Sequence, residues 1–482
     1  MAAAHQENFA EQPLITHMID QISQRQAQSS CIWETATPAL AANDRELIID
    51  LYDKTQKLEP NNVYKIGVFA LLSGQALPES SYTTIEDYLF GHLWLALQQE
   101  DTTPPIESLG ESIRKYGPDH FQAEESSGWA YVLPLLASQQ FKTALAYLAE
   151  VGGSTGLLQA THLGLIFSLK GVDVGDLGAQ TGSSGSLVTA LLVKYAALLE
   201  GDASAGPIAA LQYLLKIPEK DRCRLEIASL IARQEGLIDT FGGMLTEEGA
   251  RERCILDEYL NRDEVSIILA ASADIVKRQS HDRSKALLCA KLFMLADRYG
   301  SLLSLLNEFI SPADDNSTEK RFWCDQSQQF YNTYLSRRTL VIESLERENS
   351  MYLVDTNTKL IQLRRFFDEL RNNRYQEAFS IVVELGLLPF TQSAITEKEK
   401  KYNDLDPILK DGFPSLLSGT MECLLGLHRK VKSEARGINE TVESRLKELQ
   451  FLARFIYIFS GLIKDMPPAT KQYIQEKRSH ML

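Results

Sequence analysis

The sequence predicts an all-α protein, built as an irregular elongated α-helical solenoid of stacked helix hairpins. Apolar residues recur with helical spacing through most of the 482 residues, and strand-like alternation is rare. A chain of this length is too long for one compact core, so we expect several domains or an extended stack. One hairpin pattern also recurs along the chain, as it does in helical repeat proteins.

The hairpin pattern is clearest around "RRFFDELRNNRYQEAFSIVVELGLLP", residues 364–389. Two helix-like runs each carry one apolar face, and Asn372 and Asn373 supply the turn between them. Gly386 suits the left-handed residue after a helix end, and Pro389 prevents continuation. One such hairpin cannot bury both faces alone. The apolar positions are Leu360, Leu363 and Phe367, followed by Tyr375, Ala378, Val382 and Leu385.

Two other segments repeat this register. "ASQQFKTALAYLAEVG" superposes on "RNNRYQEAFSIVVELG" and places Ala144 on Ala378, and "DRYGSLLSLLNEF" follows the helix-like "SKALLCAKLFMLA". An aromatic residue that opens a helix, with a small or aliphatic residue three positions later, is typical of stacked hairpins. We therefore expect close helix contacts at Ala144 and Ala378. The matching positions are Phe141, Ala144, Leu148, Val151 and Gly152, and Tyr299, Leu302, Leu306 and Phe309.

In chain order, we expect a polar, poorly structured N-terminal segment at 1–43. The N-terminal part of the solenoid is predicted at 44–310 and its C-terminal part at 311–482. Helices are predicted at 44–58, 83–100, 185–200, 220–236 and 440–463, and breaks at 171–185, 311–320 and 391–407. The most apolar stretch, 455–463, covers less than half of the roughly 20 residues that a bilayer requires, so it is interpreted as a buried helix. The tail after Pro467 and Pro468 is predicted to leave the helix and to dock lightly.

Composition excludes some classes of protein. A net charge of −15 without a clustered basic surface argues against nucleic-acid binding. The first residues lack a basic segment followed by an apolar core, so no secretory signal is predicted. The six cysteines are predicted to be reduced thiols of a cytosolic or nuclear protein, because they are far apart in the sequence. They are Cys31, Cys223, Cys254, Cys289, Cys324 and Cys423.

No catalytic, cofactor-binding or metal-binding residue is predicted. The eight histidines never form a metal-ligand pair, and His428 is interpreted as a helix-end residue favoured by the helix dipole. The glycine-rich loop from Gly171 lacks the pattern of a phosphate-binding loop. Asp314 and Asp315 resemble the start of the D-D-x-x-D magnesium motif of terpenoid synthases, but Thr318 takes its fifth position. A solvated loop is therefore the favoured interpretation.

A family resemblance covers most of the chain. "MYLVDTNTKLIQLRRFFDELRNNRYQEAFSIVVELGLLP" from Met351, "DPILKDGFPSLLSGTMECLLGLHRKVK" from Asp406 and "RLKELQFLARFIYIFSGLI" from Arg445 resemble the nucleoporin interacting component family. Its members are linker scaffold nucleoporins of the inner ring of the nuclear pore. "NNVYKIGVFALLSGQALPESSYTTIEDYLFGHLWLAL" from Asn61 resembles the family's stretch around an E-D-Y-L motif, here Glu86, Asp87, Tyr88 and Leu89.

The resemblance implies a solenoid in which the chain doubles back, without enzyme activity. It implies a structural role at the nuclear envelope in nucleocytoplasmic transport of protein and mRNA. Implied partners are the inner-ring scaffold nucleoporins and a short segment of a small membrane-associated nucleoporin. Family members hold channel nucleoporins through an N-terminal coiled coil. This sequence shows no sustained heptads before about Asp44, so we do not expect that interaction from it.

Two alternatives of other classes remain open. One is a helical-solenoid subunit of a vesicle coat or tethering complex. The other is an all-α metal-dependent enzyme centred on Asp314 and Asp315. The sequence does not identify partner-binding residues, because residues that stack hairpins and residues that dock partners are both apolar.

Overall fold

The computed structural model describes residues 16, 42–97, 99, 101–121, 128–174, 186–201, 206–246, 251–279, 282–311, 317–335, 339–434 and 440–481. Within these ranges the chain is helical almost throughout and has no β-strand, and an isolated antiparallel bridge joins Leu245 and Arg251. The predicted all-α class is therefore confirmed for this part of the chain. None of its helices combines the length and hydropathy that a bilayer-spanning segment needs.

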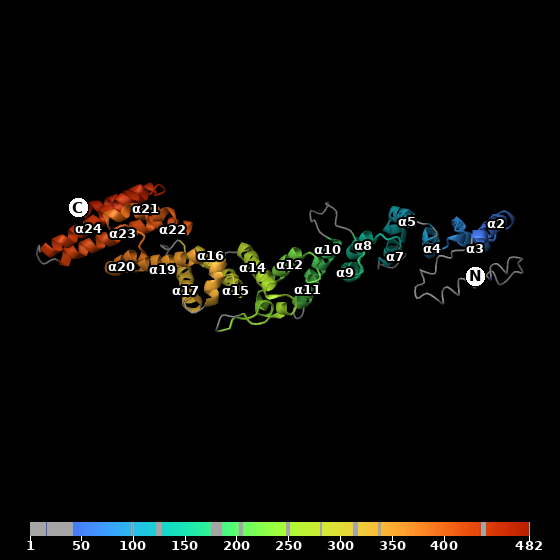
Figure 1. Cartoon of the computed structure of the whole chain (residues 1–482), viewed down its shortest axis with the longest axis horizontal. Helices are drawn as coiled ribbons and strands as arrows, with labels where there is room; N and C mark the ends of the chain where they lie inside the picture. The colour runs from blue at the N-terminus through green and yellow to red at the C-terminus, as the bar shows by residue number, and fades with distance from the viewer. Residues whose placement is uncertain are drawn as a thin grey trace. The chain divides into compact units, whose positions relative to one another are not determined.

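The chain divides into two compact units, residues 1–223 and 224–482. Figure 1 shows their helices in chain order, from α2 in blue to α24 in red. The segments predicted from sequence, 1–43, 44–310 and 311–482, have other boundaries and stay a prediction. Apart from Thr16, residues 1–41 lie outside the described part of the chain.

The helices of the first unit are α2 (Ala42–Leu58), α3 (Val63–Ser73), α4 (Ile85–Leu97), α5 (Thr103–Tyr116), α6 (Pro118–Phe121), α7 (Trp129–Ala137), α8 (Phe141–Val151), α9 (Gly153–Leu169), α10 (Leu187–Leu199) and α11 (Gly206–Leu214). Helix α12 (Lys220–Arg233) begins in the first unit and ends in the second. A 3₁₀ turn, η2, covers Glu79–Ser81.

The second unit continues with α13 (Ile238–Gly242), α14 (Arg262–Gln279), α15 (Arg283–Leu295), α16 (Tyr299–Ile310), α17 (Thr318–Phe330), α18 (Thr339–Arg347), α19 (Met351–Arg371), α20 (Tyr375–Leu385), α21 (Ile395–Asn403), α22 (Pro407–Asp411), α23 (Phe413–Glu434), α24 (Glu440–Leu462) and α25 (Pro468–Ser479). Its short turns are η4 (Glu235–Leu237), η5 (Ile255–Glu258) and η7 (Gln392–Ala394), and η6 (Tyr331–Leu335) is a π-helical turn.

Helices pack on helices that are close in the chain. In the first unit α8 packs on α7 and α9, and α10 packs on α9 and α11. In the second unit α16 packs on α15, α17, α18 and α19, and α23 packs on α19, α20, α22, α24 and α25. Contacts restricted to chain neighbours are the signature of a helical solenoid, so the predicted stack of hairpins is confirmed.

A three-residue turn joins several of these helices. Its second residue has a positive φ although it is not glycine, and the third residue donates its N–H to a carbonyl five positions back. This pattern is the Schellman motif, which satisfies the free carbonyls of a helix end. It ends α7, α15, α18 and α19 and orients the helix that follows. The positive-φ residues are Gln139 (59°), Asp297 (54°), Asn349 (51°) and Asn373 (59°).

The three hairpins predicted from sequence have this turn. Phe141, Tyr299 and Tyr375 are the first residues of α8, α16 and α20, as the shared register predicts. Ala144 and Ala378 are both 0% exposed, so the predicted close helix contacts are confirmed. Val151 departs from the register, because it is 46% exposed.

Two C-terminal expectations are wrong. Residues 391–407 form η7 and α21, because Ile395 and Tyr402 lie two helical turns apart and bury one face. The tail after Pro467 forms α25, which packs on α23 and α24 and buries Ile474. Pro468 takes the first helical position, where its missing N–H removes no hydrogen bond. Helix α25 therefore covers part of α23 and α24 at the C-terminal end of the stack.

Two more interpretations need correction in the same region. Only one face of residues 455–463 is buried, because Ile458 is 38% exposed and Leu462 is 42% exposed. His428 is not a helix-end residue, since α23 continues to Glu434 and the His428 side chain is only 6% exposed. Burial, with a contribution from Lys432, lowers the pKa of His428, whereas the dipole at a helix end would raise it.

Candidate functional site

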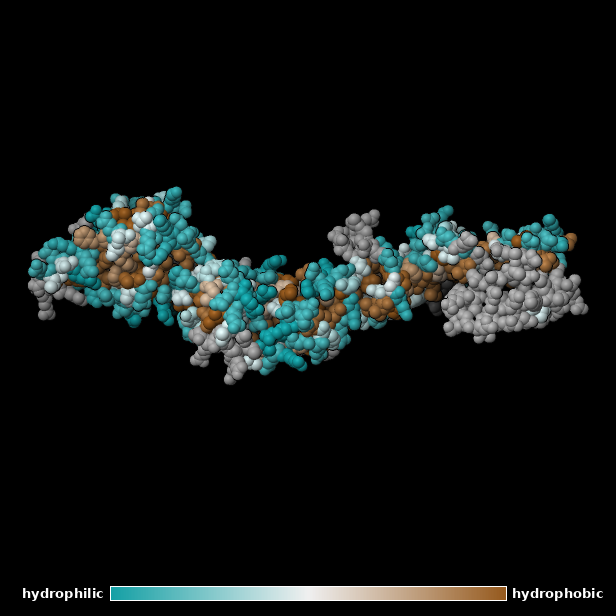
Figure 2. All heavy atoms as spheres, in the orientation of Figure 1, coloured by the Kyte–Doolittle hydropathy of each residue, from teal (hydrophilic) through white to brown (hydrophobic). Residues whose placement is uncertain are grey.

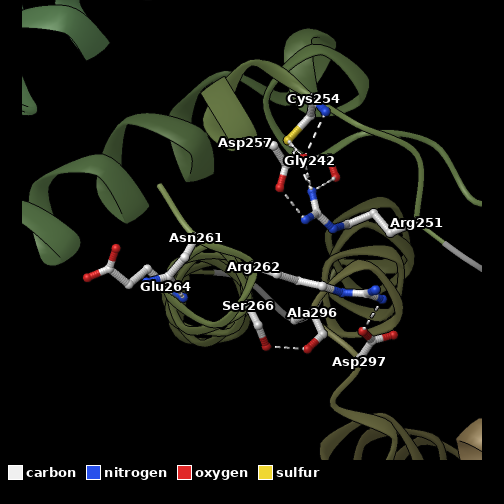
Figure 3. Close-up of polar contacts among 10 residues, drawn as sticks. All are labelled: Gly242, Arg251, Cys254, Asp257, Asn261, Arg262, Glu264, Ser266, Ala296 and Asp297. Atoms are coloured by element: carbon white, nitrogen blue, oxygen red, sulfur yellow. Dashed lines mark hydrogen bonds and ion pairs between the residues drawn. The ribbon is translucent and has the colours of Figure 1, made fainter. Parts of the chain in front are cut away.

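The second unit holds two adjoining polar clusters, which Figure 3 shows at α13–α16. The first surrounds the turn between α15 and α16. From the N-terminal turns of α14, Ser266 donates a hydrogen bond to the Ala296 carbonyl at 2.5 Å and Arg262 pairs with Asp297 at 3.1 Å. Two side chains of α14 therefore hold the turn inside the α15–α16 hairpin.

The same turn is held from the other side by α18 and the residues that follow it. Ser344 donates to the Asp297 carbonyl at 3.0 Å, and the Glu348 carboxylate accepts the N–H of Gly300 at 3.2 Å. A carboxylate at this position satisfies a free N–H at the start of α16 and complements the helix dipole. A Cβ at Gly300 would lie 2.5 Å from the Glu348 oxygen, so a larger residue here would displace the Glu348 carboxylate.

The second cluster centres on Arg251. Its guanidinium donates two hydrogen bonds to Asp257, at 2.6 and 2.9 Å, and further ones to the Gly242 carbonyl and the Cys254 sulfur. The Cys254 N–H also donates to Asp257, and this hydrogen bond caps the start of the η5 turn. The Arg251 side chain is only 5% exposed. A buried, bidentate pair of this kind fixes geometry, and losing either partner leaves an uncompensated charge.

Protonation in this cluster is set by the Arg251 pair. Burial acts to raise the pKa of Asp257, but the Arg251 guanidinium and the Cys254 N–H outweigh it and lower the pKa to about 2. Burial and the hydrogen bond to Asp257 raise the pKa of the Cys254 thiol. At neutral pH the cluster therefore holds a carboxylate and a thiol, and neither suits a general acid or a thiolate nucleophile.

A cavity of about 460 Å³ adjoins the Arg251 cluster. It is lined by Asp239 and Thr240 of α13 and by Arg253, Cys254, Ile255, Asp257 and Glu258. Two backbone segments lie close together here. Gly243 has φ 84°, and a Cβ on it would lie 2.4 Å from the Glu252 carbonyl oxygen. Its walls carry Asp239, Asp257 and Glu258 against Arg253. Two of these carboxylates already have partners, since Asp257 pairs with Arg251 and Asp239 pairs with Lys291.

The residues weighed from sequence are not brought into one site. Asp314, Asp315 and most of the loop from Gly171 lie outside the described ranges. Gly171 itself has φ 70° and ends α9, as a connector does. Across the described residues, no group of three or more His, Cys, Asp or Glu is placed to hold a metal ion. Burial raises the pKa values of Cys289 and Cys423 to about 12, so these two thiols stay protonated at neutral pH.

The E-D-Y-L motif has a structural role at the start of α4. The Asp87 carboxylate accepts the N–H of Thr84 at 3.1 Å, and the Thr84 hydroxyl accepts the N–H of Asp87 at 3.2 Å. This reciprocal pair is a capping box with aspartate in the usual glutamate position. It fixes the start of the helix that carries Tyr88 and His92, whose rings lie 4.1 Å apart.

Comparison with known proteins identifies relatives along most of the chain. The sequence model of the Nup93/Nic96 family matches residues 51–473. Nuclear pore complex protein Nup93 of Danio rerio is 24% identical over 440 residues, which is 83% of this chain and 50% of that protein. Meiotically up-regulated gene 87 protein of Schizosaccharomyces pombe is 20% identical over 469 residues, which is 88% of this chain and 54% of that protein. The chain thus spans about half the length of these relatives.

The fold also has a solved counterpart. The crystal structure of Chaetomium thermophilum Nic96 SOL matches with a TM-score of 0.51 at 15% identity, over 97% of this chain and 73% of that one. At this identity the likeness concerns the fold, and it agrees with the stacked hairpins described above.

Proposed function

Because the chain belongs to the Nup93/Nic96 family, we propose that it is a structural scaffold nucleoporin of the inner ring of the nuclear pore complex. The observation that carries this proposal is the family match over residues 51–473, which begins within α2 and ends within α25. In this role the chain resides at the nuclear envelope, binds other nucleoporins and supports nucleocytoplasmic transport. It performs no catalytic step.

The architecture supports a scaffold role. Short hydrogen-bonded turns join the hairpins, and the polar cluster at Asp297 ties α14 and α18 to the turn before α16, which supports a rigid surface. Grooves between stacked hairpins bind amphipathic or extended peptide segments through apolar anchors. We propose that the partners are inner-ring scaffold nucleoporins and a segment of a small membrane-associated nucleoporin.

Imaging and affinity purification in cells test this proposal. A fluorescently tagged chain is expected at the nuclear rim and is expected to purify with nucleoporins. Leu306→Asp is the matched control, because it places a charge at a position in α16 that is 3% exposed and breaks the stack. Purification with vesicle-coat subunits, or a tagged chain that is folded but absent from the rim, would overturn the assignment.

A further inference from the structure

Helix α21 is a charged helix that lies against the apolar C-terminal helices. It packs on α24, and the ring of its Tyr402 lies 4.8 Å from the ring of Phe413, the first residue of α23. Phe413 in turn lies 6.1 Å from Phe459 of α24. Figure 2 shows hydrophilic and hydrophobic surface side by side over the helices that Figure 1 labels α21–α24. Tyr402 is therefore one of the side chains that keep water from Phe413, which is 1% exposed.

Few side chains hold α21 in this place. Residues 391–403, which contain η7 and α21, have two buried side chains, Ile395 at 7% and Tyr402 at 8% exposed. The other residues of this segment are exposed or partly exposed. Helix α21 packs mainly on one helix, α24, whereas α23 packs on five. We call residues 391–403 the α21 flap.

Without its contacts the flap has little to keep it helical. Helix α21 is 9 residues long, and isolated helices shorter than about 12–15 residues are marginal in water. Its Lys401–Glu397 pair joins side chains that are 61% and 62% exposed, and such pairs contribute little. The flap therefore loses its helix together with its contacts. Segments with few buried contacts open at a low free energy.

Two lysine contacts hold the flap closed. Lys398 of α21 donates to the carbonyl of Gly386, which ends α20, and Lys410 of α22 donates to the carbonyl of Asn403 at 2.7 Å. A cation is favourable beside the C-terminal carbonyls of a helix. Both lysines are only partly buried, so opening exchanges these hydrogen bonds for hydrogen bonds to water.

From the two buried side chains and the two lysine contacts, we propose that the α21 flap is a gate, which opens as one unit while α23 and α24 stay folded. Leu388 and Leu409, each 2% exposed, hold the chain on either side of the flap. The closed flap covers Phe413, and the open flap uncovers it together with part of α24. The inference is independent of the proposed function, since it uses only the contacts around α21.

Hydrogen exchange on the full chain, without urea and in urea below the unfolding transition, tests the opening. We expect the α21 amides to have protection factors at least about tenfold below those of α24. Urea should change the exchange of α21 little, because local opening exposes little surface. If α21 and α24 had the same protection and the same urea dependence, they would unfold as one unit and the proposal would be wrong.

Lys398→Met tests the contact with Gly386. We expect this variant to lower the protection of the α21 amides by at least about threefold, since a hydrogen bond from a charged group is lost. Lys401→Met is the matched control in the same helix. It removes only the exposed pair with Glu397, so its effect should be smaller. Equal effects of the two variants would overturn the role of Lys398 in holding the flap closed.

Replacing residues 391–403 by a Gly-Ser segment of equal length mimics the open flap. We expect this chain to stay folded, with a cooperative thermal melt and with helix content lowered only by the replaced segment. It should bind the dye ANS more strongly than the parent chain, because Phe413 is uncovered. A replaced chain that no longer folds would show that the flap is an integral part of the stack. That result, or a folded chain that binds no more dye than the parent, overturns the proposal.

Discussion

Helices α4 and α16 are similar in length and apolar content, yet they are buried to very different extents. Eight residues of α16 are buried, including Leu302, Leu303 and Leu306, whereas Gly91 and Ala96 are the only fully buried residues of α4. Helix α16 packs on four helices, α15, α17, α18 and α19, while α4 packs mainly on α3 and α5. In a stack, burial of a helix thus depends on how many neighbours reach it as well as on its sequence.

Side-chain contacts of another kind stabilise α4. The Trp94 indole N–H donates to the Leu71 carbonyl at 2.7 Å, and the Phe90 ring stacks on Trp94 at 5.9 Å. Leu71 is in the last turns of α3, so this hydrogen bond satisfies a carbonyl at a helix end. The side chains that make these contacts are partly exposed. Truncating an apolar side chain of α4 therefore leaves a smaller cavity than truncating one of α16.

The largest expected effect tests this difference directly. Leu302→Ala in α16 is expected to lower the free energy of unfolding by about 2–5 kcal/mol, since Leu302 is 2% exposed. Leu93→Ala in α4, at a half-buried position, is expected to cost clearly less. Denaturant titration of both variants measures the two values. Equal losses would show that α4 is covered more fully than its contacts with α3 and α5 indicate.

The sequence predicted α4 and α16 equally well, and it could not predict their difference. Spacing determines which residues of a helix lie on one face, but only the packed structure shows which faces meet a neighbour. The same limit explains the error at 455–463, where a run apolar on all sides was interpreted as fully buried. It also explains α25, because the Pro467-Pro468 pair is equally compatible with a helix start and a helix end.

The repeated register predicts a second effect, which should be alike in both units. Ala144 of α8 and Ala378 of α20 are both 0% exposed at helix contacts. Leucine at either position is expected to overpack the interface and to cost about 1–3 kcal/mol. Thermal melting of Ala144→Leu and Ala378→Leu measures this cost. An unchanged melting temperature in either variant would contradict the shared hairpin geometry.

A buried polar network links α16 to two of its neighbours. The Asn357 amide of α19 donates to Asn307 of α16 at 2.7 Å, and the Ser327 hydroxyl of α17 donates to Asn357 at 2.7 Å. Asn307 in turn donates to the Leu353 carbonyl at 3.2 Å. Each of the three polar side chains is at most 1% exposed. Buried groups of this kind are stabilising only while all remain paired.

Asn357→Ala is therefore expected to lower the free energy of unfolding by about 1–3 kcal/mol, because Asn307 and Ser327 each lose a buried partner. Asn372→Ala, at an exposed position, is the matched control and should have a smaller effect. Urea titration monitored by circular dichroism gives both values. If the two variants lost the same stability, the network would not be the feature that distinguishes α16 from α4.

The polar clusters show what sequence reasoning misses at the level of sites. Arg251, Cys254 and Asp257 follow at intervals of three residues, a pattern too common to predict a buried ion pair. Ser344 and Glu348 bind the turn at Asp297, although they are almost fifty residues further along the sequence. No local sequence pattern predicts such a pairing. The turn itself was predictable at Asn372 and Asn373, where asparagine readily adopts a positive φ.

The smallest expected effect concerns acid stability, and it depends on how fully α23 is buried. His428 is 6% exposed, and burial together with Lys432 lowers its pKa in the folded chain below the usual 6.5. Between these two pKa values the unfolded chain binds a proton that the folded chain does not bind. Stability from a neutral His428 is therefore present above pH 6.5 and is lost as pH falls towards the folded pKa.

His428→Gln is expected to flatten this dependence, because glutamine has no proton to gain. Lys432→Met should flatten it less, since it removes only the smaller cause of the pKa shift and leaves burial in place. Denaturant titrations from neutral pH down through pH 6.5 give the slope of unfolding free energy against pH for each variant. The same slope in the parent chain and in His428→Gln would mean that water reaches this face of α23. In that case the helices packed on α23, like those packed on α4, would not exclude water from it.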